Sequence, residues 1–354
     1  MFVEQIYRSL SKQKTIFFFE WDVFALQEVC FIEISLEKSR DMRIVFLGTP
    51  DFAVASLQAM VEAGFQVVGV VTAPDKPSGR GLQMHQTPVK QFAVQHDIPV
   101  LQPIRLKDPD FLSALRAWNA DIQVVVAFRM LPEVVWAMPP LGTFNLHGSL
   151  LPDYRGAAPI HWAVIRGEKE TGVTTFFLQH SIDTGDILLQ AKTPIGPEET
   201  TGDVYARLMN IGAQLVVETL EGIQNKKIKP FPQPERAFLK EAPKLFKETA
   251  EINWNQSCQE VVNFVRGMNP HPAAWTTLEG KTYKIFKVKL SEPTEGSGNA
   301  RHSKEGLSYQ TDQKSYWKIQ ASDGWIDLCE IQPEGKRKMS IDEFLRGYRW
   351  PDTQ

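Results

Sequence analysis

The sequence predicts an α/β protein with a doubly wound, Rossmann-like parallel sheet, followed by a smaller C-terminal β-barrel of the OB-like kind. From Met42 onward, continuous apolar runs alternate with amphipathic segments of helix length, which is typical of buried parallel strands joined by helices. Beyond about Leu239, short strand-like runs separated by turn residues replace this pattern, which favours a small barrel.

The elements of the predicted sheet follow from local pattern. Met42–Leu47 is an unbroken, mostly apolar run that ends at Gly48, as a buried strand and its turn would. Phe52–Gly64 has helical periodicity and stops at its glycine. By the same criteria we predict strands at 66–71, 121–127, 141–147 and 172–179, and helices at 88–96, 110–120, 157–166 and 203–220.

A proline-rich segment separates the two predicted domains. Pro230, Pro232 and Pro234 disfavour regular structure and indicate an ordered linker. We therefore expect a first domain at 42–222, a linker at 223–240 and a second domain at 241–354, preceded by an N-terminal extension at 1–41. In the second domain we predict a helix at 257–266, strands at 281–290, 315–321 and 325–331, and a short helix at 341–346.

Bulk composition excludes little. The 354 residues carry a net charge of −3, from 39 basic and 42 acidic side chains, so a nucleic-acid partner would need a local basic patch. Cys30, Cys258 and Cys329 lie far apart, which shows neither a metal spacing nor a disulfide framework and suits a reducing cytoplasm. The apolar run at 16–19 meets Glu20 and Asp22, so it is too short to span a bilayer.

Asn145, His147 and Asp183 are the candidate catalytic residues. An amide can donate to an oxyanion, an imidazole can carry a proton, and a carboxylate can orient the imidazole. Asn145 and His147 are two apart on a predicted strand, so their side chains should share a face. That position is the carboxyl end of a strand, where open α/β sheets bind ligands. For a histidine considered alone, the simpler interpretation would be a core residue whose ring nitrogens are hydrogen-bonded and which has no catalytic role.

Other motifs are open to two interpretations. Gly48-Thr49-Pro50-Asp51 lacks the three glycines of a dinucleotide fingerprint, which weakens a dehydrogenase hypothesis. The segment 74–81 is either a solvated loop or a loop that orders on an anion through Lys76 and Arg80. Arg155 either faces a negative group or belongs to a tight loop. The lysines at 281, 284, 287 and 289, and the cations at 336–338, form either a solvated face or a phosphate-binding surface.

Taken together, these motifs resemble the methionyl-tRNA formyltransferases, a family of folate-dependent formyltransferases. The most specific stretch is 145–152 followed by 155–160, and 48–52, 76–81 and 183–186 agree with it in order and spacing. The resemblance covers Met42 to about Tyr348. It implies formyl transfer from 10-formyltetrahydrofolate to the α-amino group of methionine on initiator methionyl-tRNA, by a cytoplasmic and monomeric enzyme that needs no metal.

The resemblance also implies roles for particular residues. Asn145, His147 and Asp183 match the catalytic set. Lys76 and Arg80 belong to a loop that engages the tRNA, and the C-terminal β-barrel binds tRNA. Folate contacts are expected from two segments, namely Ser149, Leu150, Leu151 and Pro152 after the catalytic strand, and Phe128, Arg129 and Met130 after the central strand.

The chain departs from the family pattern in places, and other functional hypotheses stay open. The family often has Tyr-Gly where this chain has Phe128-Arg129, and more lysine where it has Leu82-Gln83. A formyltransferase acting on glycinamide ribonucleotide or an amino sugar would use the same three catalytic residue types, although Gly148 stands where the ribonucleotide enzyme should have proline. A non-catalytic tRNA-binding protein on an old enzyme scaffold is the rival from another class. For residues 1–41, which lie outside the resemblance, we expect translation to start at Met42, and a true extension is the alternative.

Overall fold

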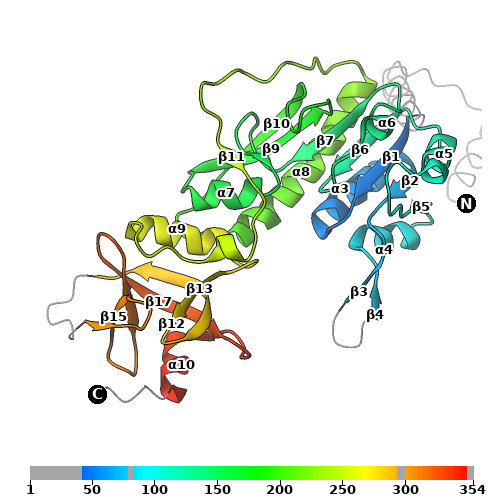
Figure 1. The fold of residues 1–354 in the computed structure, drawn as a ribbon. Helices are drawn as coiled ribbons and strands as arrows, with labels where there is room; N and C mark the ends of the chain where they lie inside the picture. The colour runs from blue at the N-terminus through cyan, green and yellow to red at the C-terminus, as the bar shows by residue number, and fades with distance from the viewer. Residues whose placement is uncertain (1–41, 79–82, 293–299, 349–354) are drawn as a thin grey trace, which may run out of the picture. The chain divides into compact units, whose positions relative to one another are not determined.

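The computed structural model describes residues 42–78, 83–292 and 300–348. The expectations for residues 1–41 and for Arg80 lie outside these ranges. Within them, no helix combines the length and apolar character needed to cross a membrane. Two domains follow one another along the chain (Figure 1), and the first contains the candidate site.

A seven-stranded sheet forms the centre of the first domain. Its strands are β1 (Arg43–Gly48), β2 (Gln66–Val71), β5 (Val100–Leu101), β6 (Ile122–Val126), β7 (Thr143–His147), β9 (Glu170–Phe177) and β10 (Ile187–Pro194). The strand order is β10-β9-β7-β6-β1-β2-β5, and neighbours from β7 to β5 are parallel. The predicted parallel α/β sheet is confirmed for these strands.

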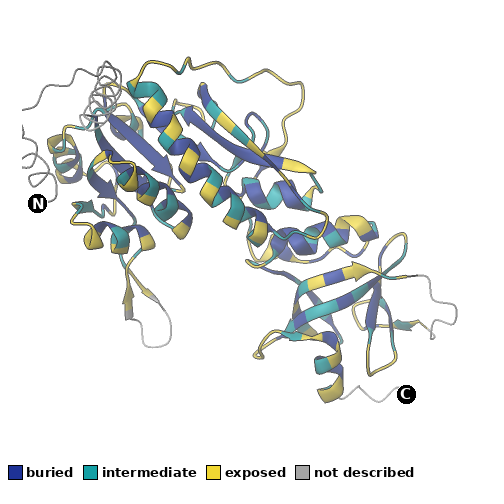
Figure 2. Cartoon of the chain, turned by 180° about the vertical axis from the view of Figure 1, so that it is seen from behind, coloured by how far each residue is buried: buried dark blue, intermediate teal, exposed yellow. Residues whose placement is uncertain are grey.

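Helices cover both faces of this sheet, and its central strands β1 and β6 are almost wholly buried (Figure 2). The helices are α3 (Asp51–Glu62), α4 (Pro88–Gln95), α5 (Pro109–Ala117), α6 (Glu133–Trp136), α7 (Pro159–Ile165) and α8 (Thr201–Gln224). Along β1, Ile44 and Phe46 pack with α3, α4, α7 and α8, whereas Val45 and Leu47 pack with α5 and α6. Successive strand side chains point to opposite faces, so both faces of β1 need apolar residues.

One edge of the sheet differs from the prediction. β9 runs antiparallel to β7, and β10, which was not predicted, runs antiparallel to β9. β10 contains three polar residues, Gln190, Lys192 and Thr193, and lies at the sheet edge, so its sequence lacks the continuous apolar run of a central strand. The two-residue strand β5 is also too short to show a periodic signal.

The segment predicted as a loop around Lys76 contains a short hairpin. Its strands are β3 (Lys76–Ser78) and β4 (Gln83–His85), which pair antiparallel. At the base of this hairpin, the Asp75 carboxylate accepts hydrogen bonds from Lys90 Nζ at 2.5 Å and from Gln102 Nε2 at 2.8 Å. These contacts fix where the hairpin leaves the sheet.

The second domain is a curled antiparallel sheet of the half-barrel kind, packed on α9 (Cys258–Met268). The predicted strands at 281–290, 315–321 and 325–331 and the predicted helices at 257–266 and 341–346 all have close counterparts in this domain, whereas its other strands were not predicted. A capping box between Ser257 and Glu260 starts α9. The remaining elements are β12 (Ala274–Leu278), β13 (Lys281–Leu290), β14 (Arg301–His302), β15 (Ser308–Thr311), β16 (Trp317–Gln320), β17 (Trp325–Pro333), β18 (Met339–Ser340) and α10 (Ile341–Gly347).

Candidate active site

Asn145 and His147 come from β7, the last parallel strand before the antiparallel edge. Phe144 and Leu146 alternate with them and enter the main core beside α8, so Asn145 and His147 face the other side of the sheet. His147 is buried and Asn145 half-buried. Within the described residues the Asn145 amide has no protein hydrogen-bond partner, which leaves its N–H groups available to a ligand.

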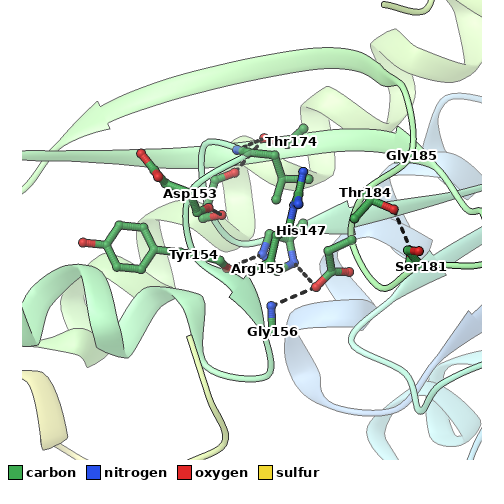
Figure 3. A network of polar contacts seen from close by, with 12 residues as sticks. His147, Asp153, Tyr154, Arg155, Gly156, Thr174, Ser181, Thr184 and Gly185 are labelled. Atoms are coloured by element: carbon green, nitrogen blue, oxygen red, sulfur yellow. Dashed lines mark hydrogen bonds and ion pairs between the residues drawn. The ribbon is translucent and has the colours of Figure 1, made fainter. Parts of the chain in front are cut away.

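The proton state of one His147 nitrogen follows from its partner. Nε2 lies 2.8 Å from the backbone carbonyl oxygen of Tyr154 (Figure 3). A carbonyl oxygen can only accept, so Nε2 must carry the hydrogen. Nδ1 is therefore the nitrogen that is left to exchange a proton with a substrate.

Asp183 completes the arrangement from the loop between β9 and β10. Its Oδ2 lies 3.9 Å from His147 Nδ1 and accepts a hydrogen bond of 2.9 Å from the Gly156 N–H. The side chains of His147 and Asp183 are only 6% and 14% exposed, so solvent screens their interaction weakly. The three predicted catalytic residues thus lie at one end of the sheet, two of them in direct electrostatic contact.

The Asp183 loop is held in an uncommon backbone conformation. Asp183 has φ 52°, in the left-handed region that few non-glycine residues occupy. Two residues later, a Cβ on Gly185 would lie 1.7 Å from the carbonyl oxygen of Phe177, so only glycine fits there. The turn therefore requires the glycine of the Asp-Thr-Gly motif.

Tyr154 presents the carbonyl that holds His147, and its own side chain is tightly held. Its backbone is also left-handed, with φ 63°. Its hydroxyl donates to Glu168 Oε1 at 2.5 Å, and Arg166 lies over its ring at 5.3 Å from the centroid. Burial, with the Glu168 carboxylate, raises the pKa of the Tyr154 phenol well above its ordinary value, so it remains a donor. Lys240 also pairs with Glu168.

The buried side chain of Thr174 holds the turn that follows β7 through hydrogen bonds. Thr174 Oγ1 donates to the Ser149 carbonyl at 2.6 Å and accepts from the Leu151 N–H at 3.1 Å. Gln190 Nε2 donates to the Leu151 carbonyl and to Thr174 Oγ1. The turn is therefore anchored to both β9 and the edge strand β10.

A groove of about 460 Å³ lies beside the end of β5 and the start of α5, away from the three candidate catalytic side chains. Its lining is mostly apolar. Arg129 borders it by donating to the carbonyls of Pro103 and Ile104, two of the lining residues. The lining residues are Leu101, Gln102, Pro103, Ile104, Asp108, Asp110, Phe111 and Ala114.

Comparison with known proteins identifies the family of this chain. The formyl transferase family matches residues 42–220, and the formyl transferase C-terminal domain matches residues 244–349. A protein named methionyl-tRNA formyltransferase from Bacteroides fragilis is 50% identical over 314 residues, covering 88% of this chain and 96% of that protein. The chain belongs to the formyl transferase family.

Further relatives agree with this family. Proteins of the same name are 50% identical over 318 residues in Bacteroides thetaiotaomicron, and 51% identical over 317 residues in Parabacteroides distasonis. These alignments cover 89% and 88% of this chain, and 98% and 97% of the relatives. An N-formyltransferase from Helicobacter canadensis, solved with folinic acid and dTDP-3-aminofucose, shares the fold with a TM-score of 0.59 at 21% identity, covering 82% of this chain and 99% of that one.

The residues predicted to contact folate in this formyl transferase fall into two sets. Ser149, Leu151 and Pro152 are buried, and the Ser149 hydroxyl donates to the Asp153 carbonyl. Leu150 is half-buried and packs against Gly172. These residues therefore build the turn beside His147. Phe128, Arg129 and Met130 form the second set. Arg129 borders the groove, Phe128 packs in the same apolar cluster as the groove residue Phe111, and Met130 is 73% exposed.

The residues predicted to contact tRNA are less closely connected to the site. Lys76 is exposed on β3, while Arg80 lies outside the described residues. In the second domain, Lys284, Lys287 and Lys289 are exposed on β13. A bulge in its pairing with β17 allows Lys284 and Lys287, three residues apart, to point to the same outer face.

Sequence reasoning missed the residues that support the site. Thr174 and Gln190 lie on strands whose pairing was not foreseen, and Gln233 lies in the predicted linker. Arg155 was a candidate for an anionic group, but its guanidinium donates to the neutral amide oxygen of Gln233. The prolines on either side of Gln233 were the one local sign that its position is fixed.

Proposed function

We propose that this chain transfers the formyl group of 10-formyltetrahydrofolate to the α-amino group of methionine on initiator methionyl-tRNA. The observation that carries the proposal is the ordered His147–Asp183 pair beside the free amide of Asn145. The names of its relatives, at about half identity over most of the chain, support this acceptor over other amines.

Asn145 and His147 stabilise the intermediate in this proposal. The amine nitrogen attacks the formyl carbon, a C–N bond forms, and the carbonyl oxygen becomes negative. The Asn145 amide and a protonated Nδ1 of His147 donate hydrogen bonds to that oxygen. The Asp183 carboxylate lies 3.9 Å from Nδ1, where it would pair with the imidazolium that donates to the oxyanion.

The second half of the reaction moves one proton. The bond between the formyl carbon and folate N10 breaks, N10 takes a proton, and the amine nitrogen loses one. Nδ1 is suited to this exchange because Tyr154 holds Nε2 in its protonated form. The products are formylmethionyl-tRNA and tetrahydrofolate, so atoms and charge balance without a covalent enzyme intermediate.

Substrate binding is proposed to use both domains. Folate would be contacted by Phe128, Arg129, Met130 and the turn at 149–152. The tRNA phosphates would be contacted by Lys76, Arg80 and the lysines of β13. We place the enzyme in the cytoplasm with the initiator tRNA and expect a monomer, which size-exclusion chromatography with light scattering would check.

A formylation assay with competing acceptors tests the proposal. The purified chain receives 10-formyltetrahydrofolate together with methionyl-initiator tRNA, glycinamide ribonucleotide or a nucleotide-linked amino sugar. We expect formylation of the methionyl-tRNA alone, because the second domain offers cations to a large polyanion. Formylation of either small acceptor, with none of methionyl-tRNA, would contradict the assignment.

A further inference from the structure

Gln233 is a half-buried residue of the segment between α8 and the second domain. Two residues before it, Phe231 exchanges two backbone hydrogen bonds with Ile187 at the start of β10, of 2.8 and 3.0 Å. Pro232 and Pro234 restrict the backbone on either side. The Gln233 side chain therefore extends from a segment that is anchored beside the candidate site.

The Gln233 amide uses its full hydrogen-bonding capacity. Nε2 donates to the carbonyls of Asp183 and Gly185, each at 2.9 Å. Oε1 accepts from Arg155, at 3.2 Å from Nε and 2.5 Å from Nη2. One amide thus connects the loop after β9 to the loop after β7.

The two loops that Gln233 connects hold the reacting groups. Arg155 lies between Tyr154, whose carbonyl fixes His147 Nε2, and Gly156, whose N–H holds the Asp183 carboxylate. The left-handed backbone of Asp183 is intrinsically unfavourable and needs external support. The donors of Gln233 provide that support at the Asp183 carbonyl itself.

We infer that Gln233 is a positioning residue for formyl transfer, which acts by holding the Asp183 carboxylate against His147. This inference rests on the proposed function. It makes the segment before the second domain a structural part of the active site. A substitution at Gln233 should therefore change turnover through Asp183, with substrate binding preserved.

The substitution Gln233→Glu separates the contact that Gln233 accepts from Arg155 from the contacts that it donates to Asp183 and Gly185. A carboxylate retains the pairing with Arg155 but has no N–H for the carbonyls of Asp183 and Gly185. We expect kcat for methionyl-tRNA to fall on the order of 10²-fold with KM for both substrates unchanged, because small displacements of catalytic groups have effects of that size. Gln233→Ala, which adds no charge, should also lower kcat.

A double-mutant cycle distinguishes positioning from a general loss of structure. In an Asp183→Asn background, Gln233→Glu should cause little further loss, because the group it positions no longer acts. Gln214→Glu, on the exposed face of α8, is the matched control and should keep wild-type kcat and melting temperature. Full additivity with Asp183→Asn, or wild-type kcat in either Gln233 variant, would overturn the inference. If the wild-type chain itself formylates no methionyl-tRNA, the proposed function fails instead.

Discussion

At the scale of single residues, the proposed reaction depends on which nitrogen of His147 would face the reactants. The Tyr154 carbonyl occupies Nε2, and the Asp183 carboxylate lies near Nδ1. The sequence predicted all three catalytic candidates because they lie in short motifs at the ends of strands. The orientation of the His147 ring could not be predicted. It depends on the backbone carbonyl of Tyr154, which lies seven residues further along the chain and has a left-handed backbone conformation.

Asn145→Ala and His147→Ala test the catalytic roles directly. Each removes one donor to the oxyanion, so single-turnover formylation should slow by ~10²–10³-fold. Rapid-quench measurement with saturating substrates checks this, with His302→Ala, an exposed histidine of the second domain, as control. A His147→Ala variant with a near-normal single-turnover rate would disprove the role assigned to His147.

At the scale of elements, Glu199 joins the end of β10 to α8. Its carboxylate pairs with Arg207 of α8 and accepts from the Gly196 N–H. Arg266 of α9 donates to the carbonyls of Gly196 and Glu199, which ties the second domain to the same point. The hydrogen bonds from Arg207 lower the pKa of Glu199 from an ordinary 4.5 to about 2.

This pKa predicts a pH-dependent contribution to stability. The Glu199 carboxylate is more acidic when folded, so its contribution is complete above pH 4.5 and is lost as the pH falls toward about 2. Glu199→Gln should reduce the free energy of unfolding by about 1 kcal/mol at pH 7, allowing for solvent screening of a side chain that is 29% exposed. Urea titrations from pH 7 to pH 3 should show this difference shrinking, and Glu198→Gln, at an exposed neighbour, should show none. A constant difference would contradict the ionic origin.

The elements also show why some predictions were wrong. β1, β2, β6 and β7 lie within a residue or two of their predicted positions, because a strand buried on both faces has a continuous apolar signal. β10 was missed, and β9 was placed without its reversed direction. Strand direction depends on how the chain returns to the sheet, which local periodicity does not encode.

At the scale of the whole molecule, the second domain carries exposed lysines that have no acidic partner among the residues that the structure describes. Lys284, Lys287 and Lys289 have no ion-pair partner within the described part of the chain, because Glu330 pairs with Lys338 and Asp327 with Lys318. This local surplus of positive charge exists although the net charge of the chain is −3. Net charge alone therefore gives no sign of this positively charged surface.

The salt dependence of tRNA binding tests this surface. Each phosphate contact releases counterions, so replacing Lys284, Lys287 and Lys289 by Gln should lower the slope of log Kd against log salt concentration by about 1 per lysine. Fluorescence titration with methionyl-tRNA at several salt concentrations measures the slope. Lys192→Gln, which removes an ion pair between the edge strand β10 and Glu170 of β9, is the control. A slope unchanged in the triple variant would exclude these lysines from the interface.

The order of amino acids was sufficient to predict an α/β domain followed by a β-rich domain, the family and three catalytic candidates. The family is confirmed by relatives at about half identity, and the roles of the three residues stay predictions. Periodicity and short motifs carry this information because they depend on neighbours in the chain. Only the tertiary structure revealed that the proton on His147 Nε2 is held by Tyr154, that the edge strands reverse, and that Gln233 connects the two catalytic loops. Those features depend on contacts between residues that are far apart in sequence, which local patterns do not specify.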